Sequence, residues 1–334
     1  MAEKILEVQH LKTYFYQDGA VVRAADDLSY DIHAGECVAI IGESGSGKSV
    51  SAMSILGLIA DPPGRIEGGK ILFHGKDLLE LDDEELAEIR GSKISMIFQE
   101  PSTALNPVMT VGKQVSEPLR VHKHMNKKEA TEKAVEALRM VNIPNPEERV
   151  KQYPFEFSGG MQQRVMIAMA MTCEPELLIA DEPTTALDVT IQAQVLEELN
   201  KLRREKGTAL LLITHNLGVV ARYADTVKIM YGGKIVEEGT ADDIFRDPHH
   251  PYTMGLIRAV PRLDRPRSEG LYTIKGDPPD MSKIQPDCCA FADRCPYADE
   301  HCRSQRPTPE VLSQTHKCSC WHQEYVRKER EDIR

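Results

Sequence analysis

The residues best suited to chemistry form the stretch 42–49, Gly-Glu-Ser-Gly-Ser-Gly-Lys-Ser, which fits the pattern G-x-x-x-x-G-K-[ST]. Its glycines let the backbone wrap closely around phosphate oxygens, so that N–H groups and the following helix N-terminus point at negative charge. Lys48 adds a cation and Ser49 a hydroxyl that can bind Mg²⁺. The apolar run Cys37–Ile41 predicts the buried strand that such a loop must follow. These residues imply that the chain binds a nucleoside triphosphate with Mg²⁺.

A pair of carboxylates indicates what happens to the triphosphate. The apolar run 177–180 leads directly into Asp181 and Glu182. A strand that ends in this way delivers negative charge beside Mg²⁺ at the carboxyl edge of a sheet. Asp181 would support the metal through its water shell, and Glu182 would polarise the attacking water as a general base. An acidic pair that merely faces solvent is the alternative, which the phosphate-binding loop makes less favourable.

These groups need a sheet to position them, and the chain supplies one. Short apolar runs of the buried-strand type alternate with helical stretches, which predicts a parallel α/β sheet. The runs are 94–98, 177–180, 209–213 and 226–230, and the helical stretches include 127–140 and 189–204.

The remaining patterns divide the chain further. Residues 5–32 and 70–73 read as strand material, with period-two alternation in residues 28–32, which predicts a small antiparallel β subdomain. Residues from about 100 to 175 are mostly helical in pattern and predict an inserted helical subdomain. We therefore expect a nucleotide-binding domain over 1–260. A Pro-rich linker and an irregular cysteine-rich extension follow over 261–334, with the charged tail from Arg327 as a solvated end.

Composition excludes some classes of function. The formal net charge of -11 argues against a nucleic-acid-binding footprint, which requires clustered Lys and Arg. No run of 18 apolar residues is present, and the first residues lack the apolar core of a signal peptide. These features predict a soluble cytosolic protein.

Residues 157–164, Phe-Ser-Gly-Gly-Met-Gln-Gln-Arg, resemble the signature sequence of ATP-binding-cassette (ABC) ATPases. Ser158 can cap the helix that follows, which leaves the N–H groups of Gly159 and Gly160 exposed to an anion. Other positions fit the same family from residue 5 to about 260. They are Gln99 as the Q-loop glutamine, Asp188 in the D-loop, His215 as the switch histidine, and Phe15 or Tyr16 as the ring that stacks on adenine.

The resemblance implies a P-loop NTPase fold of ABC type, with a mixed-sheet core, that hydrolyses ATP. Each chain would hold two half-sites, and two chains would close ATP between the phosphate loop of one and the signature of the other. Glu182 and His215 are the implied catalytic residues, and Ser49, Gln99 and Asp181 the implied Mg²⁺ ligands. The implied nucleotide contacts are Phe15, Tyr16, Gly42, Glu43, Ser44, Gly45, Ser46, Gly47, Lys48, Ser49, Val50, Gln99, Ser158, Gly159, Gly160, Gln162 and Asp188.

Within that family, the stretches 161–171, 181–194, 247–253 and 276–279 resemble the ATPase subunits of dipeptide and oligopeptide importers. The implied partners are a homologous second ATPase, with a homodimer possible for the isolated chain, two transmembrane permease subunits and, indirectly, an external peptide-binding protein. The implied location is the cytoplasmic face of the membrane. The transported solute stays open. A soluble cassette protein of translation or DNA repair is an alternative, but such proteins usually carry two cassettes or long coiled coils. A non-enzymatic nucleotide sensor is disfavoured by the presence of both Glu182 and His215.

Six of the eight cysteines lie between residues 288 and 320. A cytosolic compartment disfavours disulfides, and the spacing lacks the tight pairs of zinc sites and the common ferredoxin run. The residues alone support only thiolates and a metal. The family resemblance implies a [4Fe-4S] cluster, for which the expected ligands are Cys289, Cys295, Cys302 and Cys320. Cys318 is a close rival for the last position, and Cys288 is expected to be spare.

Overall fold

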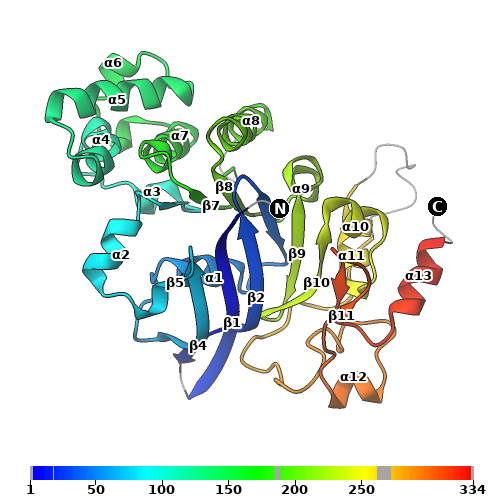
Figure 1. Ribbon diagram of the computed structural model, residues 1–334. Helices are drawn as coiled ribbons and strands as arrows, with labels where there is room; N and C mark the ends of the chain where they lie inside the picture. The colour runs from blue at the N-terminus through cyan, green and yellow to red at the C-terminus, as the bar shows by residue number, and fades with distance from the viewer. Residues whose placement is uncertain (1–2, 18, 185–188, 262–271, 332–334) are drawn as a thin grey trace. The chain divides into compact units, whose positions relative to one another are not determined.

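The computed structural model describes residues 3–17, 19–184, 189–261 and 272–331 (Figure 1). The chain forms two compact units. The first comprises residues 1–6, 31–37 and 72–213, and the second comprises residues 7–30, 38–71 and 214–334. Each unit is described by itself.

The first unit contains the parallel strands β6 (Ile94–Ile97), β7 (Leu177–Asp181) and β8 (Ala209–Ile213), which follow the predicted runs closely. Ile94 pairs with Leu177, and Leu177 in turn pairs with Ala209, so the three strands end at the same edge. Every residue of these strands is buried, which explains why the sequence shows continuous apolar runs rather than alternation.

Helices fill the segment predicted to be helical (Figure 1). They are α3 (Pro101–Ala104), α4 (Val111–His122), α5 (Lys127–Met140), α6 (Pro146–Arg149) and α7 (Gly159–Met171). Helix α5 buries Ala130, Ala134 and Leu138, which recur at helical spacing and form its apolar face. The same unit contains β5 (Lys76–Asp77), the short helix η1 (Leu78–Glu80), α2 (Asp83–Ile89), η2 (Pro154–Glu156) and α8 (Val189–Lys206).

Most of β1 (Lys4–Gln17), β2 (Ala20–His33) and β4 (Gly64–Phe73) belongs to the second unit, where they are neighbours in the order β2-β1-β4. A further ladder runs in the order β11-β12-β10-β9-β3. Its strands are β3 (Cys37–Ile41), β9 (Thr226–Tyr231), β10 (Lys234–Thr240), β11 (Glu310–Val311) and β12 (Lys317–Cys318). Strand β3 pairs with β9 in parallel, whereas the other neighbours are antiparallel. The helices of this unit are α1 (Lys48–Ile55), α9 (Leu217–Tyr223), α10 (Ala241–Arg246), α11 (Pro251–Ala259), α12 (Glu300–Ser304) and α13 (Gln323–Glu331).

The C-terminal part corrects one expectation. The extension is not purely irregular, because β12 pairs with β10 and so continues a sheet of the nucleotide-binding domain. The tail from Arg327 begins inside α13, and its residues Arg327 and Lys328 are exposed. Val326 of this helix is fully buried, and Glu329 pairs with Arg258 and accepts a hydrogen bond from Tyr297. These contacts dock one side of α13 on other parts of the chain.

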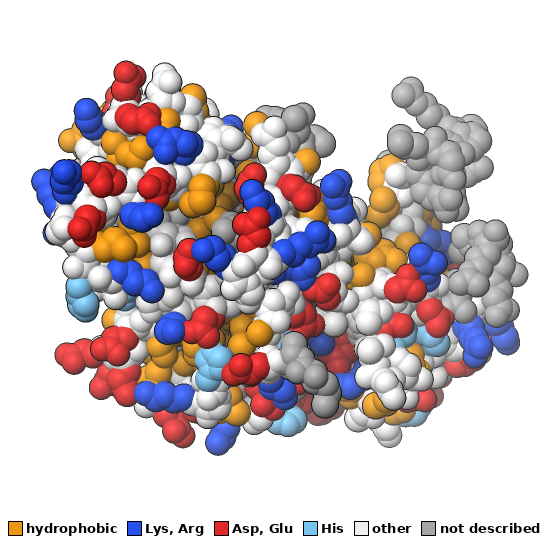
Figure 2. Space-filling model, turned by 45° about the horizontal axis from the view of Figure 1, so that its top comes forward, with side chains coloured by type: hydrophobic (Ala, Val, Ile, Leu, Met, Phe, Trp, Pro, Cys, Tyr) orange, Lys and Arg blue, Asp and Glu red, His pale blue; other side chains and the backbone are white. Residues whose placement is uncertain are grey.

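The described surface mixes charges of both signs. On the face shown in Figure 2, acidic and basic side chains are interspersed. None of the helices in the described segments combines the length and hydropathy needed to cross a bilayer.

Candidate nucleotide site and cysteine extension

The loop 42–49 connects β3 to α1, as the sequence predicted. Close backbone contacts require two of its glycines. A Cβ atom on Gly47, whose φ is 98°, would lie 1.8 Å from the carbonyl oxygen of Ala24. A Cβ atom on Gly42 would lie 2.2 Å from the carbonyl oxygen of Met230. Any side chain at either position would displace the loop, so glycine is required here by packing as well as by phosphate binding.

Lys48 is buried and folds back over this loop. Its Nζ donates hydrogen bonds to the carbonyl oxygens of Gly42 at 2.9 Å and Glu43 at 2.8 Å. The N–H of Ser46 donates to the carbonyl oxygen of Glu43 at 3.2 Å, which closes the turn. The cation is thus held at the loop by the loop's own backbone, the arrangement needed to receive phosphate oxygens.

Phe15 and Tyr16 lie near the end of β1. The Phe15 ring packs over Gly64, where a Cβ atom would lie 2.7 Å from it. Tyr16 is more exposed, and its hydroxyl donates to Glu67 Oε1 at 2.8 Å. Adenine stacking by either ring remains a prediction.

In the first unit, Asp181 is the buried last residue of β7, and Glu182 follows it with a φ of 46°. This left-handed backbone is uncommon for glutamate and costs on the order of 1 kcal/mol. The Glu182 N–H donates to the carbonyl oxygen of Ile213 at 2.8 Å, which holds that conformation. Gln99 Nε2 donates to Glu182 Oε2 at 3.2 Å. The structure therefore brings together two predicted site residues that are far apart in sequence.

The predicted signature begins α7. Ser158 Oγ accepts a hydrogen bond from the N–H of Met161 at 3.4 Å, and Gly159 on the first turn is exposed. Gln162 has a use that the sequence did not reveal. Its Nε2 donates to the carbonyl oxygens of Pro154 at 2.8 Å and Phe157 at 3.3 Å, so its amide braces the segment before the helix.

Two further predicted site residues are His215 and Asp188. His215 is separated from β8 by Thr214, is exposed, and belongs to the same unit as the phosphate-binding loop. Asp188 lies outside the described residues.

The cysteine extension gathers thiols. All eight cysteines are free thiols. Burial raises the pKa of Cys320 to about 12, with smaller contributions from the neighbouring thiols of Cys289, Cys295 and Cys302. Burial likewise raises the pKa of Cys289 to about 11, with Cys302 and Cys295 again nearby. The N–H of Cys289 donates to the carbonyl oxygen of Cys302 at 2.9 Å, and Cys289 and Cys295 pack against the same apolar cluster. Parts of the extension that are separated in sequence therefore meet around the predicted ligands.

Backbone N–H groups surround these sulfur atoms. The N–H of His322 donates to Cys320 Sγ at 3.3 Å, and backbone groups of Phe291 and Ala292 bond to the Cys289 thiol. A different trio also approaches metal-binding geometry, since ligand atoms of Asp299, Cys302 and His322 lie within 4.8 Å of one another.

The two other cysteines of the segment differ from these four. Cys318 is buried in β12, and burial followed by the nearby Glu237 carboxylate raises its pKa. Cys288 donates to the carbonyl oxygen of Arg303 at 2.7 Å.

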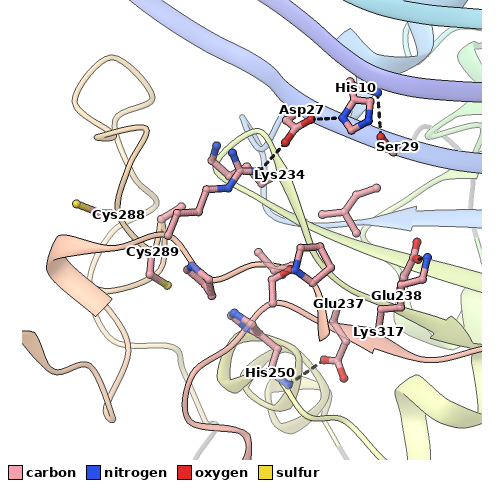
Figure 3. A pocket seen from close by; sticks show the side chains of 17 residues that line it. His10, Asp27, Ser29, Lys234, Glu237, Glu238, His250, Cys288, Cys289 and Lys317 are labelled. Atoms are coloured by element: carbon pink, nitrogen blue, oxygen red, sulfur yellow. Dashed lines mark hydrogen bonds and ion pairs between the residues drawn. The ribbon is translucent and has the colours of Figure 1, made fainter. Parts of the chain in front are cut away.

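A cavity of about 280 Å³ lies where the extension meets β10. Figure 3 shows Cys288 and Cys289 on its wall, with Lys234, Glu237 and His250 on other parts of the lining. Glu237 is already saturated, because it accepts the N–H of His250 at 3.0 Å and approaches His316 Nε2 at 2.8 Å. These polar contacts tie the extension to the sheet.

Sequence reasoning missed two residues that hold the phosphate-binding loop from outside. The N–H of Glu43 donates to the hydroxyl of Tyr252 at 2.9 Å. Its carboxylate pairs with Arg294. These partners lie more than 200 positions from Glu43, and no local pattern marks them.

A glycine loop between strand and helix with a lysine folded over it, together with a buried strand that ends in Asp-Glu, defines a P-loop nucleoside triphosphatase. Residues 25–185 match the family model "ABC transporter", and residues 236–302 match "Oligopeptide/dipeptide transporter, C-terminal region". The chain belongs to the ABC transporter family and is an ABC ATPase.

Curated relatives agree over nearly the whole chain. The dipeptide transport ATP-binding protein DppD of Bacillus subtilis is 51% identical over 322 residues, which are 96% of each chain. The oligopeptide transport ATP-binding protein OppD of the same organism is 50% identical over 95% of this chain and 88% of its own.

Solved structures resemble the cassette part. A dimeric bacterial ABC transporter cassette is 29% identical, with a TM-score of 0.65, and covers 71% of this chain and 99% of its own. A dimeric post-hydrolysis state of a cassette bound to ADP and Pi is 28% identical, with the same TM-score and coverage. The ABC fold with its mixed α/β core is thereby confirmed.

Proposed function

We propose that this chain is the ATP-hydrolysing subunit of an ABC importer for dipeptides or oligopeptides. The observation that carries the proposal is the similarity to peptide-transport ATPases at about half identity, which extends through both the cassette and the C-terminal region. In this role the chain works at the cytoplasmic face of the membrane with two permease subunits and a homologous second ATPase. An external binding protein supplies the solute.

The proposed mechanism uses two copies of the cassette. ATP binds to the loop 42–49 of one cassette and is covered by the signature around Ser158 of the other. Hard oxygen donors suit Mg²⁺, and the hydroxyl of Ser49 with the carboxylate of Asp181 fits that preference. Bound Mg²⁺ neutralises charge on the phosphates. Glu182 takes a proton from the attacking water, and His215 contacts the γ-phosphate.

Gln99 orients the base in this proposal. Its hydrogen bond of 3.2 Å to Glu182 Oε2 orients the carboxylate that would act on the attacking water. Closure of the two cassettes switches the access of the permease, and hydrolysis reopens them.

Uptake measurements test the function. A strain that lacks this chain should lose uptake of labelled dipeptides or longer peptides, and the wild-type chain should restore it. A Glu182→Gln chain expressed at the same level should not restore uptake. Unchanged peptide uptake in the deletion strain, with loss of a different solute, would contradict the peptide assignment.

We propose further that the extension holds a [4Fe-4S] cluster through Cys289, Cys295, Cys302 and Cys320. Thiolates are the ligands that such clusters use, and backbone N–H groups directed at sulfur are typical of their surroundings. Free thiols gathered in one place fit this group. When bound, the cluster supplies cross-links that fold a segment with a small apolar core.

Iron and acid-labile sulfide in anaerobically purified protein test the cluster, and about four of each per chain are expected. Cys320→Ser should lose most of the iron, whereas Cys288→Ser is a matched control that should keep it. Stoichiometric zinc without sulfide would contradict the proposal. Loss of iron in Cys318→Ser but not in Cys320→Ser would move the fourth ligand to Cys318.

A further inference from the structure

Glu43 is an unexpected residue in a loop that binds phosphates. It follows Gly42, and its carbonyl oxygen accepts a hydrogen bond from Lys48 Nζ at 2.8 Å. A carboxylate at this position adds negative charge where a triphosphate must bind. Like charges at a protein surface repel each other, so an unpaired carboxylate here would weaken triphosphate binding. The loop therefore needs a counter-charge for Glu43.

Arg294 of the cysteine extension supplies that charge. Its Nη1 donates to Glu43 Oε2 at 2.6 Å and its Nη2 donates to Oε1 at 3.1 Å. The side chain of Arg294 is 8% exposed and that of Glu43 is 22% exposed. Such a two-pronged, largely desolvated pair fixes direction as well as charge, because both donors of the planar fork must stay aligned.

Arg294 is itself held by its surroundings. Its Nε donates to the carbonyl oxygen of Lys275 at 3.1 Å. Its backbone N–H donates to the carbonyl oxygen of Phe291, also at 3.1 Å. The guanidinium lies 5.9 Å from the centre of the Tyr231 ring. These contacts fix the position of the Arg294 guanidinium beside the phosphate-binding loop.

Aromatic packing also links the cysteine extension to the phosphate-binding loop. The Phe291 ring lies edge-on to Tyr231 at 5.1 Å and tilted against Tyr252 at 5.4 Å between ring centres. Tyr252 accepts the backbone N–H of Glu43 at 2.9 Å. Both the backbone and the side chain of Glu43 are therefore fixed by residues that follow the cassette's last strand.

We propose that Arg294 is a positioning residue for nucleotide binding, which neutralises and orients Glu43 so that the cysteine extension sets the ATP affinity of the phosphate-binding loop. The inference rests on ATP binding at residues 42–49 and holds whichever metal the extension contains. Arg294 acts through Glu43 and does not touch ATP.

The test compares nucleotide affinity and turnover in the full-length protein, with a fluorescent ATP analogue and a steady-state ATPase assay. Arg294→Ala should weaken binding and raise the KM for ATP about tenfold, because Glu43 is left unpaired beside the phosphates. The kcat at saturating ATP should change less than about twofold, because no catalytic group moves. Arg303→Ala is the matched control, since Arg303 in the same segment pairs with the exposed Asp293 and should leave both values unchanged.

Charge removal at the second site separates this role from simple loss of structure. Adding Glu43→Gln to Arg294→Ala should recover most of the lost affinity, because the unpaired carboxylate is then removed. Unchanged affinity in Arg294→Ala, or no recovery in the double variant, would overturn the proposal. Should Arg294→Ala fail to fold, Arg294→Lys carries the test. It keeps the charge but loses the fork, so affinity equal to wild type would count against the proposal, and about threefold weaker binding would support it.

Discussion

Glu182 illustrates how a single residue can be committed to chemistry at a cost to stability. Its backbone adopts a φ of 46°, which most side chains avoid. The hydrogen bond from its N–H to Ile213 and the contact from Gln99 hold it there. These two contacts hold both the backbone and the carboxylate of Glu182 just after the end of β7.

Replacing Glu182 by Gln should slow ATP hydrolysis about 100-fold or more, because the amide cannot accept the proton of the attacking water. ATP binding should be retained, since the phosphate-binding loop is untouched. Single-turnover hydrolysis and binding of a fluorescent ATP analogue check the two parts. Glu174→Gln is the control, because Glu174 also has a positive φ but pairs with Lys206 at the surface. Normal turnover in Glu182→Gln would refute the assigned base.

His250 links one residue to the pH dependence of stability. It is buried at the start of α11, where its Nδ1 accepts the N–H of Tyr252 at 3.1 Å. Burial lowers its pKa from 6.5 to about 4, although the nearby Glu237 opposes this shift. The neutral form is therefore favoured in the folded state, while the unfolded chain takes up a proton at the ordinary pKa.

The sign follows from that difference. The unfolded state binds more protons between pH 6.5 and about pH 4, so folding stability falls as the pH is lowered through this window. His250→Asn keeps an N-cap acceptor but does not titrate. Between pH 7.5 and pH 5.5, the free energy of unfolding of the wild type should fall by about 1 kcal/mol more than that of the variant. Urea unfolding at both pH values measures it, and a gap independent of pH would exclude His250 as the cause.

At the scale of elements, a buried ion pair joins β2 to β10. Asp26 pairs with Lys234 and also accepts the hydroxyl of Tyr14 at 2.8 Å. Burial raises the pKa of Asp26, but hydrogen bonds from Lys234 and Tyr14 outweigh it, so the net pKa lies below the ordinary value. The two strands are therefore joined by two buried charges of opposite sign, and each charge is stable in the interior only while the other is present.

Lys234→Met should destabilise the protein by about 3 kcal/mol, because it leaves the Asp26 charge buried without its partner. Adding Asp26→Asn should recover much of this loss, since neither charge then remains. Chemical denaturation of the single and double variants gives the values. Lys76→Met is the comparison, because the pair of Lys76 with Glu85 is exposed and screened by solvent, so its loss should change stability little. A loss of similar size in both single variants would argue against a special role for the buried pair.

At the scale of the whole molecule, the proposed mechanism makes each chain incomplete. The signature helix α7 begins at the exposed residue Gly159, and a helix N-terminus can bind an anion. Lys48, in contrast, donates hydrogen bonds to the phosphate-binding loop of its own chain. A catalytic pocket shared by two chains predicts that defects in different halves complement each other.

Lys48→Ala and Ser158→Arg chains should each be inactive alone. A pair purified through two different tags would contain one pocket with both defects and one with neither, so it should show about half of wild-type ATPase activity. A pair that carries Lys48→Ala in both chains is the inactive control. Absence of recovery in the mixed pair would contradict the shared pocket.

Much of the fold could be predicted from the sequence because its signals are local. Strands β3, β6, β7 and β8 show as short apolar runs, and α5 begins and ends where its pattern predicts. The phosphate-binding loop was equally readable, since its glycines and its lysine must lie within a few positions to enclose one phosphate chain.

Long-range pairing lies beyond such signals. The pairing of β12 with β10 and the docking of α13 depend on partners such as Glu237 and Arg258 that no neighbouring residue announces. The hydrogen bond of Gln99 to Glu182 spans 83 positions and became visible only because β6 and β7 end at one edge.

By itself the sequence determined the residue types that bind phosphate and the strands that carry them, because hydrophobic period and backbone sterics act over neighbouring residues. Only the tertiary structure decided that Arg294 meets Glu43 across 251 positions and that the thiols of the extension gather. Such contacts are selected by the packing of the completed chain, where a charge is stable in the interior only if folding delivers its partner.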